Sequence, residues 1–265
     1  MGIGYLPIEE HGLIGNMHTA ALVGINGRID WLCLPNFDSP TVFCALLDDE
    51  IGGYFSISPT NVNGCKCKQL YWPDSNILIT RFLHHDAIVE VIDYMPVGIN
   101  PGQPGFHSLI RRVALIRGHL EMKMVCLPAF NYARDDHTLE LLDGGHSVDF
   151  HSATCELFLH SSHDMQIDGK AAVTTFTLDE DRQSVVFSLQ EMRYTTRPVQ
   201  RFTCALDRDL FRSTFEYWTE WLSHCTYRGR WRHRVHRAAL AMKLMTYDPT
   251  GAIIAAPTFG LVRSS

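Results

Sequence analysis

Short apolar runs separated by turn signals dominate roughly the first 204 residues of the chain. In residues 19–34, Asn26-Gly27 divides two apolar runs, TAALVGI and RIDWLCL. Asn-Gly supplies the two positive-φ residues of a type I′ hairpin turn. Because nearly every residue of both runs is apolar, we predict two adjacent strands that are buried on both faces.

Similar pairs of runs follow along the chain. Three more pairs of runs are divided by a turn signal. His85-Asp86 lies between runs 77–83 and 88–94, Arg117-Gly118 between 109–116 and 119–127, and Asp168-Gly169 between 165–167 and 171–178. Residues 184–189 form a further short run. Apolar residues at 120, 122, 124 and 126 alternate with polar ones, the period-2 pattern of a half-exposed strand. We therefore predict a series of hairpins in a mainly β fold, an antiparallel β-supersandwich.

The pattern changes to helical near Asp207. Phe211, Phe215, Trp218 and Leu222 recur at spacings of four, three and four, which predicts a helix over 209–225. A second helix is expected from about 230 to 246, where Asp248-Pro249-Thr250-Gly251 ends it. The sandwich should thus be followed by two C-terminal helices.

The second helix carries apolar side chains on opposite sides. Val235, Ala238, Met242 and Met245 line one side, and Leu240 and Leu244 point nearly the opposite way. A helix that is apolar all round needs partners all round. We expect the first helix and the chain after Thr258 to contain too few residues to bury the second helix on all sides. Leu240 and Leu244 would then be exposed and could mediate self-association.

Composition narrows the class of protein. The 265 residues are 46% hydrophobic and 20% charged, typical of a globular chain, and no apolar run reaches the ~18 residues of a membrane span. The formal net charge of −6 gives no general reason to bind nucleic acid or an anionic membrane. The first ten residues lack a signal-peptide pattern, so the eight cysteines are expected to be reduced thiols in a cytoplasmic protein. No cofactor-binding fingerprint is found, and we expect no cofactor.

Three stretches together resemble glycoside hydrolase family 15, in its trehalase-like and glucoamylase-like branch. They are 5–53, YLPIEEHGLIGNMHTAALVGINGRIDWLCLPNFDSPTVFCALLDDEIGG; 127–134, LPAFNYAR; and 227–258, YRGRWRHRVHRAALAMKLMTYDPTGAIIAAPT. The first resembles the opening signature of the family, the second an element of its sandwich domain, and the third the entry into its catalytic domain.

The resemblance implies a division of the chain and a chemistry. Residues 1–204 would form the trehalase-like N-terminal sandwich, 205–229 a helical linker, and 230–265 the truncated start of a catalytic (α/α)6 barrel. Family members hydrolyse α-glucosidic bonds with inversion, using two barrel glutamates ~6.5–9.5 Å apart. After Thr258 the family would continue Thr-Ser-Leu-Pro-Glu, whereas this chain reads Phe259-Gly260-Leu261-Val262-Arg263. No catalytic residue can be assigned here, and the chain alone is expected to be inactive.

A substrate-binding role is considered for Asp30, Trp31, Asn36, Phe37 and Asp38, which combine aromatic faces with carboxylate and amide groups. In the alternative, Trp31 fills the core, Asp38 caps a short helix begun by Ser39-Pro40, and Asp30 supports a turn. Relatives often carry Arg where this chain has Asn36, which weakens a binding role for that residue.

Other clusters have simpler interpretations. The acidic run 48–50 is expected to be solvated surface at a helix end, and His84-His85 to be an exposed turn. Cys65-x-Cys67 lacks the second pair that a zinc site needs, so no metal site is predicted. Arginines at 228, 230, 232, 234 and 237 form the only basic cluster, but they scatter around the helix, so nucleic-acid binding is not expected.

Three hypotheses for function remain. In the first, the chain is the sandwich part of a glycosidase whose complete form acts on trehalose or a maltooligosaccharide. Only that complete form would have an α-glucoside as its partner. Alternatively, it is a stand-alone module that binds carbohydrate or another protein, or it is a gene product with no function of its own.

Overall fold

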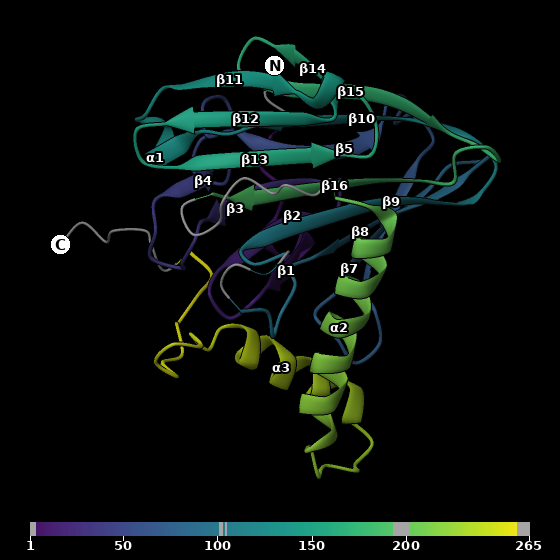
Figure 1. The fold of residues 1–265 in the computed structure, drawn as a ribbon. Helices are drawn as coiled ribbons and strands as arrows, with labels where there is room; N and C mark the ends of the chain where they lie inside the picture. The colour runs from purple at the N-terminus through teal and green to yellow at the C-terminus, as the bar shows by residue number, and fades with distance from the viewer. Residues whose placement is uncertain (1–3, 101–102, 104, 193–201, 259–265) are drawn as a thin grey trace.

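In a computed structural model, residues 4–100, 103, 105–192 and 202–258 are described, and they form two packed antiparallel sheets with two long helices below them (Figure 1). The residues after Thr258, where the sequence departs from the family pattern, lie outside the described ranges.

The first sheet has the strand order β1-β2-β3-β5-β10-β15-β14, with β4 paired to β3. Its strands are β1 (His11–Gly15), β2 (Ala20–Gly24), β3 (Arg28–Cys33), β4 (Thr41–Phe43), β5 (Tyr54–Pro59), β10 (Leu120–Leu127), β14 (Gln166–Asp168) and β15 (Ala171–Leu178). β2 and β3 pair across the predicted Asn26-Gly27 turn and are buried along their whole length, as the apolar runs predicted. Gly27 has a φ of 82° whereas Asn26 has no positive φ, so the turn is not of the predicted type I′. The alternation predicted for β10 is also confirmed.

The second sheet has the order β11-β12-β13-β16-β9-β8-β7-β6. Its strands are β6 (Lys66–Tyr71), β7 (Leu78–Leu83), β8 (Ile88–Tyr94), β9 (Ser108–Arg117), β11 (His137–Leu142), β12 (Ser147–Ser152), β13 (Glu156–Ser161) and β16 (Ser184–Glu191). Short helical turns occupy Ile8–Glu10, Phe130–Ala133 (α1) and Asp143–Gly145. The predicted β7–β8 and β14–β15 hairpins are present. The fold class, a sandwich followed by two helices, is therefore confirmed.

One predicted hairpin is wrong. β9 and β10 follow each other in sequence but lie in different sheets, β9 between β8 and β16 and β10 between β5 and β15. The intervening Gly118 has φ 79°, and a Cβ atom there would collide with the carbonyl oxygen of Asp86. The Arg117-Gly118 signal thus marks a crossing between sheets under the β7–β8 turn, which only a glycine can make.

Helix α2 (Cys204–Ser223) covers part of the outer face of the second sheet (Figure 1). Its Leu210 packs on apolar side chains of β7, β8, β9 and β16. At its first turn, the Asp207 carboxylate accepts hydrogen bonds from the Tyr94 hydroxyl at 2.8 Å and from Arg112 at 2.8 Å. These buried polar contacts fix the start of the helix against the sheet.

The packing of helix α3 (Arg232–Leu244) shows that the expectation of uncovered leucines was wrong. Leu240 and Leu244 are buried in a cluster with Met17, Phe37 and Trp218, so the sandwich and α2 enclose them. Met17 and Phe37 belong to the sandwich, which supplies the cover that the first helix and the chain after Thr258 were expected to lack. At these two residues no exposed surface remains for the expected self-association.

The opposite side of α3 faces solvent, with Met242 54% exposed. Polar contacts hold the buried side in register. The Asn76 side-chain amide donates to the Leu240 carbonyl at 3.1 Å, and Arg237 donates to the Ser75 carbonyl at 2.7 Å. The loop between β6 and β7 therefore acts as a polar clamp on α3.

Candidate functional site

The three stretches that carry the family resemblance meet at one corner of the molecule, beside β3, β4 and α1 (Figure 1). From the first stretch, the fully buried Trp31 donates its indole N–H to the Pro257 carbonyl of the third at 3.1 Å. From the second stretch, the Tyr132 backbone N–H donates to the Thr41 hydroxyl at 2.9 Å. Tyr132 also packs on the apolar cluster that contains Trp31. Residues more than 200 positions apart in the sequence thus form a single structural unit, which we call the motif corner.

The second stretch has an unusual backbone at this corner. Asn131, Tyr132 and Ala133 have φ values of 52°, 62° and 60°, so three successive residues other than glycine are left-handed. Each such residue costs about 1–2 kcal/mol relative to right-handed backbone. The turn is held by the buried Phe130 side chain and by the hydrogen bond from Tyr132 to Thr41. Backbone strain of this kind is concentrated at functional sites, which makes this turn the strongest candidate the sequence analysis did not identify.

The loop between β3 and β4 contacts the segment after α3. The Tyr247 hydroxyl donates to the Asn36 side-chain carbonyl at 3.3 Å, and the Tyr247 ring meets the buried Phe37 ring edge-on at a centroid distance of 6.2 Å. Asp38 is exposed and lies in a turn, and only Ser39 and Pro40 separate it from β4, so the short helix expected after it is absent. Trp31, Asn36 and Phe37 therefore bind the chain's own C-terminal segment.

Asp30 is separated from this group, because neighbouring residues of a strand point to opposite faces. Its carboxylate contacts Arg28 at 2.8 Å and His11 at 3.0 Å, and Arg28 in turn reaches Asp49 at 2.7 Å. Asp49 is thus part of an ion network, whereas the run 48–50 was expected to be solvated throughout. Of the five predicted substrate-binding residues, Trp31 contacts Pro257, Asn36 and Phe37 contact Tyr247, Asp30 lies in the ion network and Asp38 is exposed. Their substrate-binding role stays a prediction.

The His11–Asp30 contact predicts a pH dependence of stability. The hydrogen bond to Asp30 raises the pKa of His11 above its ordinary value of 6.5, against the opposing effect of burial. The folded state binds the proton more tightly than the unfolded chain, so this stabilisation is complete below pH 6.5 and is lost as the pH rises through the folded pKa. Urea unfolding from about pH 5 to about pH 9 should show this loss. His11→Gln should abolish this component; an unchanged pH profile in that variant would contradict the assignment.

A second prediction concerns Trp31. Trp31→Phe keeps most of the buried ring but removes the donor to Pro257, and should cost about 0.5–1.5 kcal/mol. The segment after α3 should open more readily, so that the amide of Ile254, bonded to the Met245 carbonyl at 3.0 Å, exchanges faster with solvent. Hydrogen exchange measures this. Trp231→Phe, at an exposed tryptophan, is the matched control and should leave the Ile254 exchange rate unchanged.

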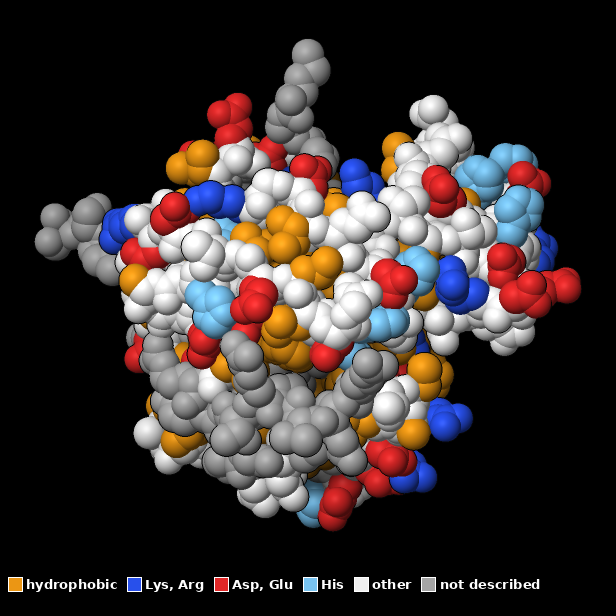
Figure 2. Space-filling view, turned by 45° about the horizontal axis from the view of Figure 1, so that its top comes forward, with side chains coloured by type: hydrophobic (Ala, Val, Ile, Leu, Met, Phe, Trp, Pro, Cys, Tyr) orange, Lys and Arg blue, Asp and Glu red, His pale blue; other side chains and the backbone are white. Residues whose placement is uncertain are grey.

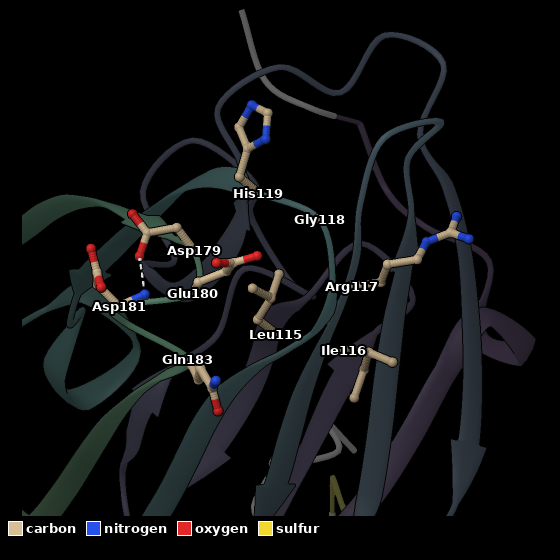
Figure 3. A pocket seen from close by; sticks show the side chains of 9 residues that line it. All are labelled: Leu115, Ile116, Arg117, Gly118, His119, Asp179, Glu180, Asp181 and Gln183. Carbon is tan, nitrogen blue, oxygen red and sulfur yellow. Dashed lines mark hydrogen bonds between the residues drawn. The ribbon is translucent and has the colours of Figure 1, made fainter.

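The described structure also has an acid-rich depression of about 750 Å³ at the far end of the sheets, between 115–119 and 179–183 (Figure 3). Asp179, Glu180 and Asp181 line it, but Figure 3 shows their carboxylates diverging instead of facing a common point. Asp179 also accepts a hydrogen bond from the Asp181 backbone N–H at 3.0 Å. The depression is wide open and does not present the facing pair of carboxylates that inversion requires.

Two side-chain groups among the described residues could offer ligands to a metal ion. One is His84, His85 and Asp86 in the β7–β8 turn, and the other is Asp149, His151 and Glu156 on β12 and β13. In the second group, His151 contacts Glu156 at 2.7 Å and Asp149 at 3.3 Å. The sequence analysis missed this group because only the pairing of β12 with β13 places His151 opposite Glu156.

The surface chemistry adds little to these candidates. On the face shown in Figure 2, basic side chains are dispersed among acidic ones and form no continuous stripe. Arg230 and Arg234 both stack on the exposed Trp231 ring, at 4.3 and 4.8 Å from its centroid. Within the described part of the chain, no helix has the length and apolar character needed to cross a membrane.

Comparisons with known proteins identify the family to which the chain belongs. The family model described as trehalase-like, N-terminal matches residues 1–206. A trehalase from Thermoplasma volcanium is 32% identical over 259 residues, which cover 97% of this chain and 40% of that protein. A trehalase from Mycobacterium tuberculosis is 29% identical over 276 residues, covering 96% of this chain and 40% of its own length. The chain thus spans 40% of the length of these curated relatives.

Solved structures show the same fold. A bacterial glucoamylase complexed with acarbose superposes with a TM-score of 0.65 at 10% identity, covering 97% of this chain and 43% of that one. A putative kojibiose phosphorylase from the human microbiome gives a TM-score of 0.52 at 10% identity, covering 93% and 41%. At this identity the likeness concerns the fold alone. The family match over residues 1–206, together with the sandwich and its motif corner, shows that the chain belongs to the trehalase-like N-terminal domain family.

Proposed function

We propose that this chain is the sandwich part of a glycoside hydrolase of family 15 that acts on α-glucosidic bonds, with trehalose as the substrate. The observation that carries the proposal is the motif corner, where Trp31 and Tyr247 hold the segment after α3 on the sandwich. Trehalases are the relatives that match along nearly the whole chain. In this proposal the sandwich is a rigid seat that sets the position of a catalytic barrel joined to that segment.

A rigid seat matters because catalytic groups must be held within about 0.5 Å of their working geometry. α3 is clamped by its buried leucines and by the β6–β7 loop, so its direction is fixed relative to both sheets. Exposed apolar side chains next to this seat, Trp231, Met242 and Ile253, offer a surface on which the barrel would pack. The two catalytic carboxylates would then come from the barrel, and this chain alone would not hydrolyse substrate.

The proposal includes a cytoplasmic location. No disulfide bond joins any of the eight described cysteines, and burial raises the pKa of Cys33 to about 12, which keeps that thiol protonated. A chain of this size whose cysteines form no disulfide bonds with one another suits a reducing compartment.

Glucose release from trehalose tests the proposal. Residues 1–265 alone should release none, whereas residues 1–258 continued with the part of the Thermoplasma volcanium trehalase that follows its matched region should release glucose. Maltose serves as a second α-glucoside and cellobiose as the β-linked control. Hydrolysis of trehalose by residues 1–265 alone would contradict the division of roles, and cleavage of cellobiose in preference to trehalose would contradict the substrate class.

A stand-alone binding module is the second candidate, and the cavity described below is the observation that favours it. If the chain is such a module, residues 1–265 would bind sugar, and the fused protein would not hydrolyse it. Calorimetry with trehalose, maltose and starch fragments, set beside the glucose-release assay, separates the two.

A further inference from the structure

A separate cavity of about 180 Å³ lies where the helices dock on the sandwich. The turn between β1 and β2 forms one wall, and residues 96–100 and 106–107 at the two ends of the β8–β9 connection form another. Tyr217 from α2 and Asp248 from the turn after α3 complete it. Because four distant segments contribute, the cavity exists only when α2 and α3 are docked.

The lining combines apolar surface with groups that can both donate and accept hydrogen bonds. The His18 and His107 rings meet edge-on at 5.1 Å, and the Phe106 ring lies 3.9 Å from that of His107. Burial and the nearby His18 lower the pKa of His107 to about 4, so its imidazole is neutral at physiological pH. The Tyr217 hydroxyl lies 3.4 Å from the Met17 sulfur, a weak acceptor, and Asp248 adds a carboxylate.

The backbone at this cavity is strained in two places. Met17 and His107 both line it, and both have left-handed backbone, with φ of 66° and 50°. The Asp248 backbone N–H holds Met17 in place by donating to its carbonyl at 2.9 Å. Two strained residues other than glycine on opposite walls of one cavity are an arrangement expected of a binding site.

The charge of the lining restricts the ligand. It contains one carboxylate and neither arginine nor lysine, so it disfavours phosphate and other anions. Its volume is well below the ~300–1,000 Å³ of sites for drug-sized ligands, which suits a single sugar ring. Apolar carbons of a pyranose can lie against Phe106 and Met17 while its hydroxyl groups reach the imidazoles, Tyr217 and Asp248.

We propose that this cavity binds one neutral hexose, glucose. Its identity as glucose, the product of the reaction, rests on the proposed function, whereas its class as a neutral monosaccharide rests on the lining. Because sandwich and helices both contribute to the cavity, bound glucose would also stabilise the docked arrangement of α2 and α3.

The test is a glucose titration of residues 1–265 with ¹³C-labelled histidine, followed by NMR. Glucose should shift the His18 and His107 resonances with a Kd in the millimolar range, and Asp248→Asn should weaken binding about tenfold. His107→Asn should also weaken it, since asparagine tolerates left-handed backbone. Asp168→Asn, at an exposed residue of β14, is the matched control and should bind as the unmodified chain does.

Several results would overturn the site. They are an absence of histidine shifts with glucose, equal shifts with inorganic phosphate or Ca²⁺, and equal weakening by Asp168→Asn and Asp248→Asn. Asp248 is exposed, so its variant keeps the test valid even if His107→Asn does not fold. Failure here leaves the trehalose assay of the fused protein unaffected, and failure of that assay leaves glucose binding intact, so the two proposals can be separated.

Discussion

Leu244→Ala is expected to lower the free energy of unfolding by about 2–5 kcal/mol. Leu244 is fully buried between β1, Phe37 and Trp218, and its side chain packs directly over Gly15. A Cβ atom added at Gly15 would lie 2.8 Å from a Leu244 methyl group, so the leucine fills the space that the glycine leaves. Removing it would leave a cavity where α3 meets the sandwich. Urea unfolding followed by circular dichroism measures the loss.

Met242→Ala is the control on the same helix. Met242 is exposed, and its truncation should change the free energy of unfolding by less than about 0.5 kcal/mol. If the two variants were equally stable, α3 would not be docked through Leu244, and the seat proposed for the catalytic barrel would lose its physical basis.

Arg111→Met is expected to cost about 3–5 kcal/mol or more. Arg111 and Asp93 are both completely buried, with Nε–Oδ1 at 2.8 Å. The guanidinium also donates to the carbonyls of Phe55 and Gly27. Since Asp93 and Arg111 lie in the second sheet and Phe55 in the first, this one side chain ties the sheets together. Without it, Asp93 would be a buried and unpaired carboxylate, and thermal unfolding should shift to markedly lower temperature.

Arg212→Met provides the comparison. Arg212 contacts Asp209 at the same 2.8 Å, but both side chains are about two-thirds exposed. A pair of this kind contributes about 0–1 kcal/mol. Similar losses for the two variants would show that burial does not set the value of the Arg111–Asp93 pair.

Much of the local structure could be predicted from sequence alone. The position of the Asn26-Gly27 turn and the burial of its strands were predicted correctly, because Asn-Gly between two apolar runs favours a turn. The turn type was not, since Gly27 has a positive φ but Asn26 does not. The helical spacing of Phe211, Phe215, Trp218 and Leu222 was equally local, and α2 contains all four. The strands β11, β12 and β13 were not predicted, because their polar and histidine-rich sequences carry a weak alternation signal.

The candidate site was predicted only in part. The three stretches of resemblance could be marked on the sequence, but not their meeting at one corner or the binding of Pro257 by Trp31. The left-handed turn at Asn131, Tyr132 and Ala133 had no local signal, because none of these residues is glycine. Its conformation is imposed by contacts with β4 that form only after folding.

The sequence by itself determined the mainly β class, the two helices and the family resemblance, because each depends on residue types at short, fixed spacings. The tertiary structure alone decided that β9 and β10 separate into different sheets, that Leu240 and Leu244 are covered, and that His18, His107 and Asp248 share one cavity. These outcomes depend on which distant surfaces come into contact. Periodicity shows which side of an element is apolar, but it does not identify the partner that will cover that side.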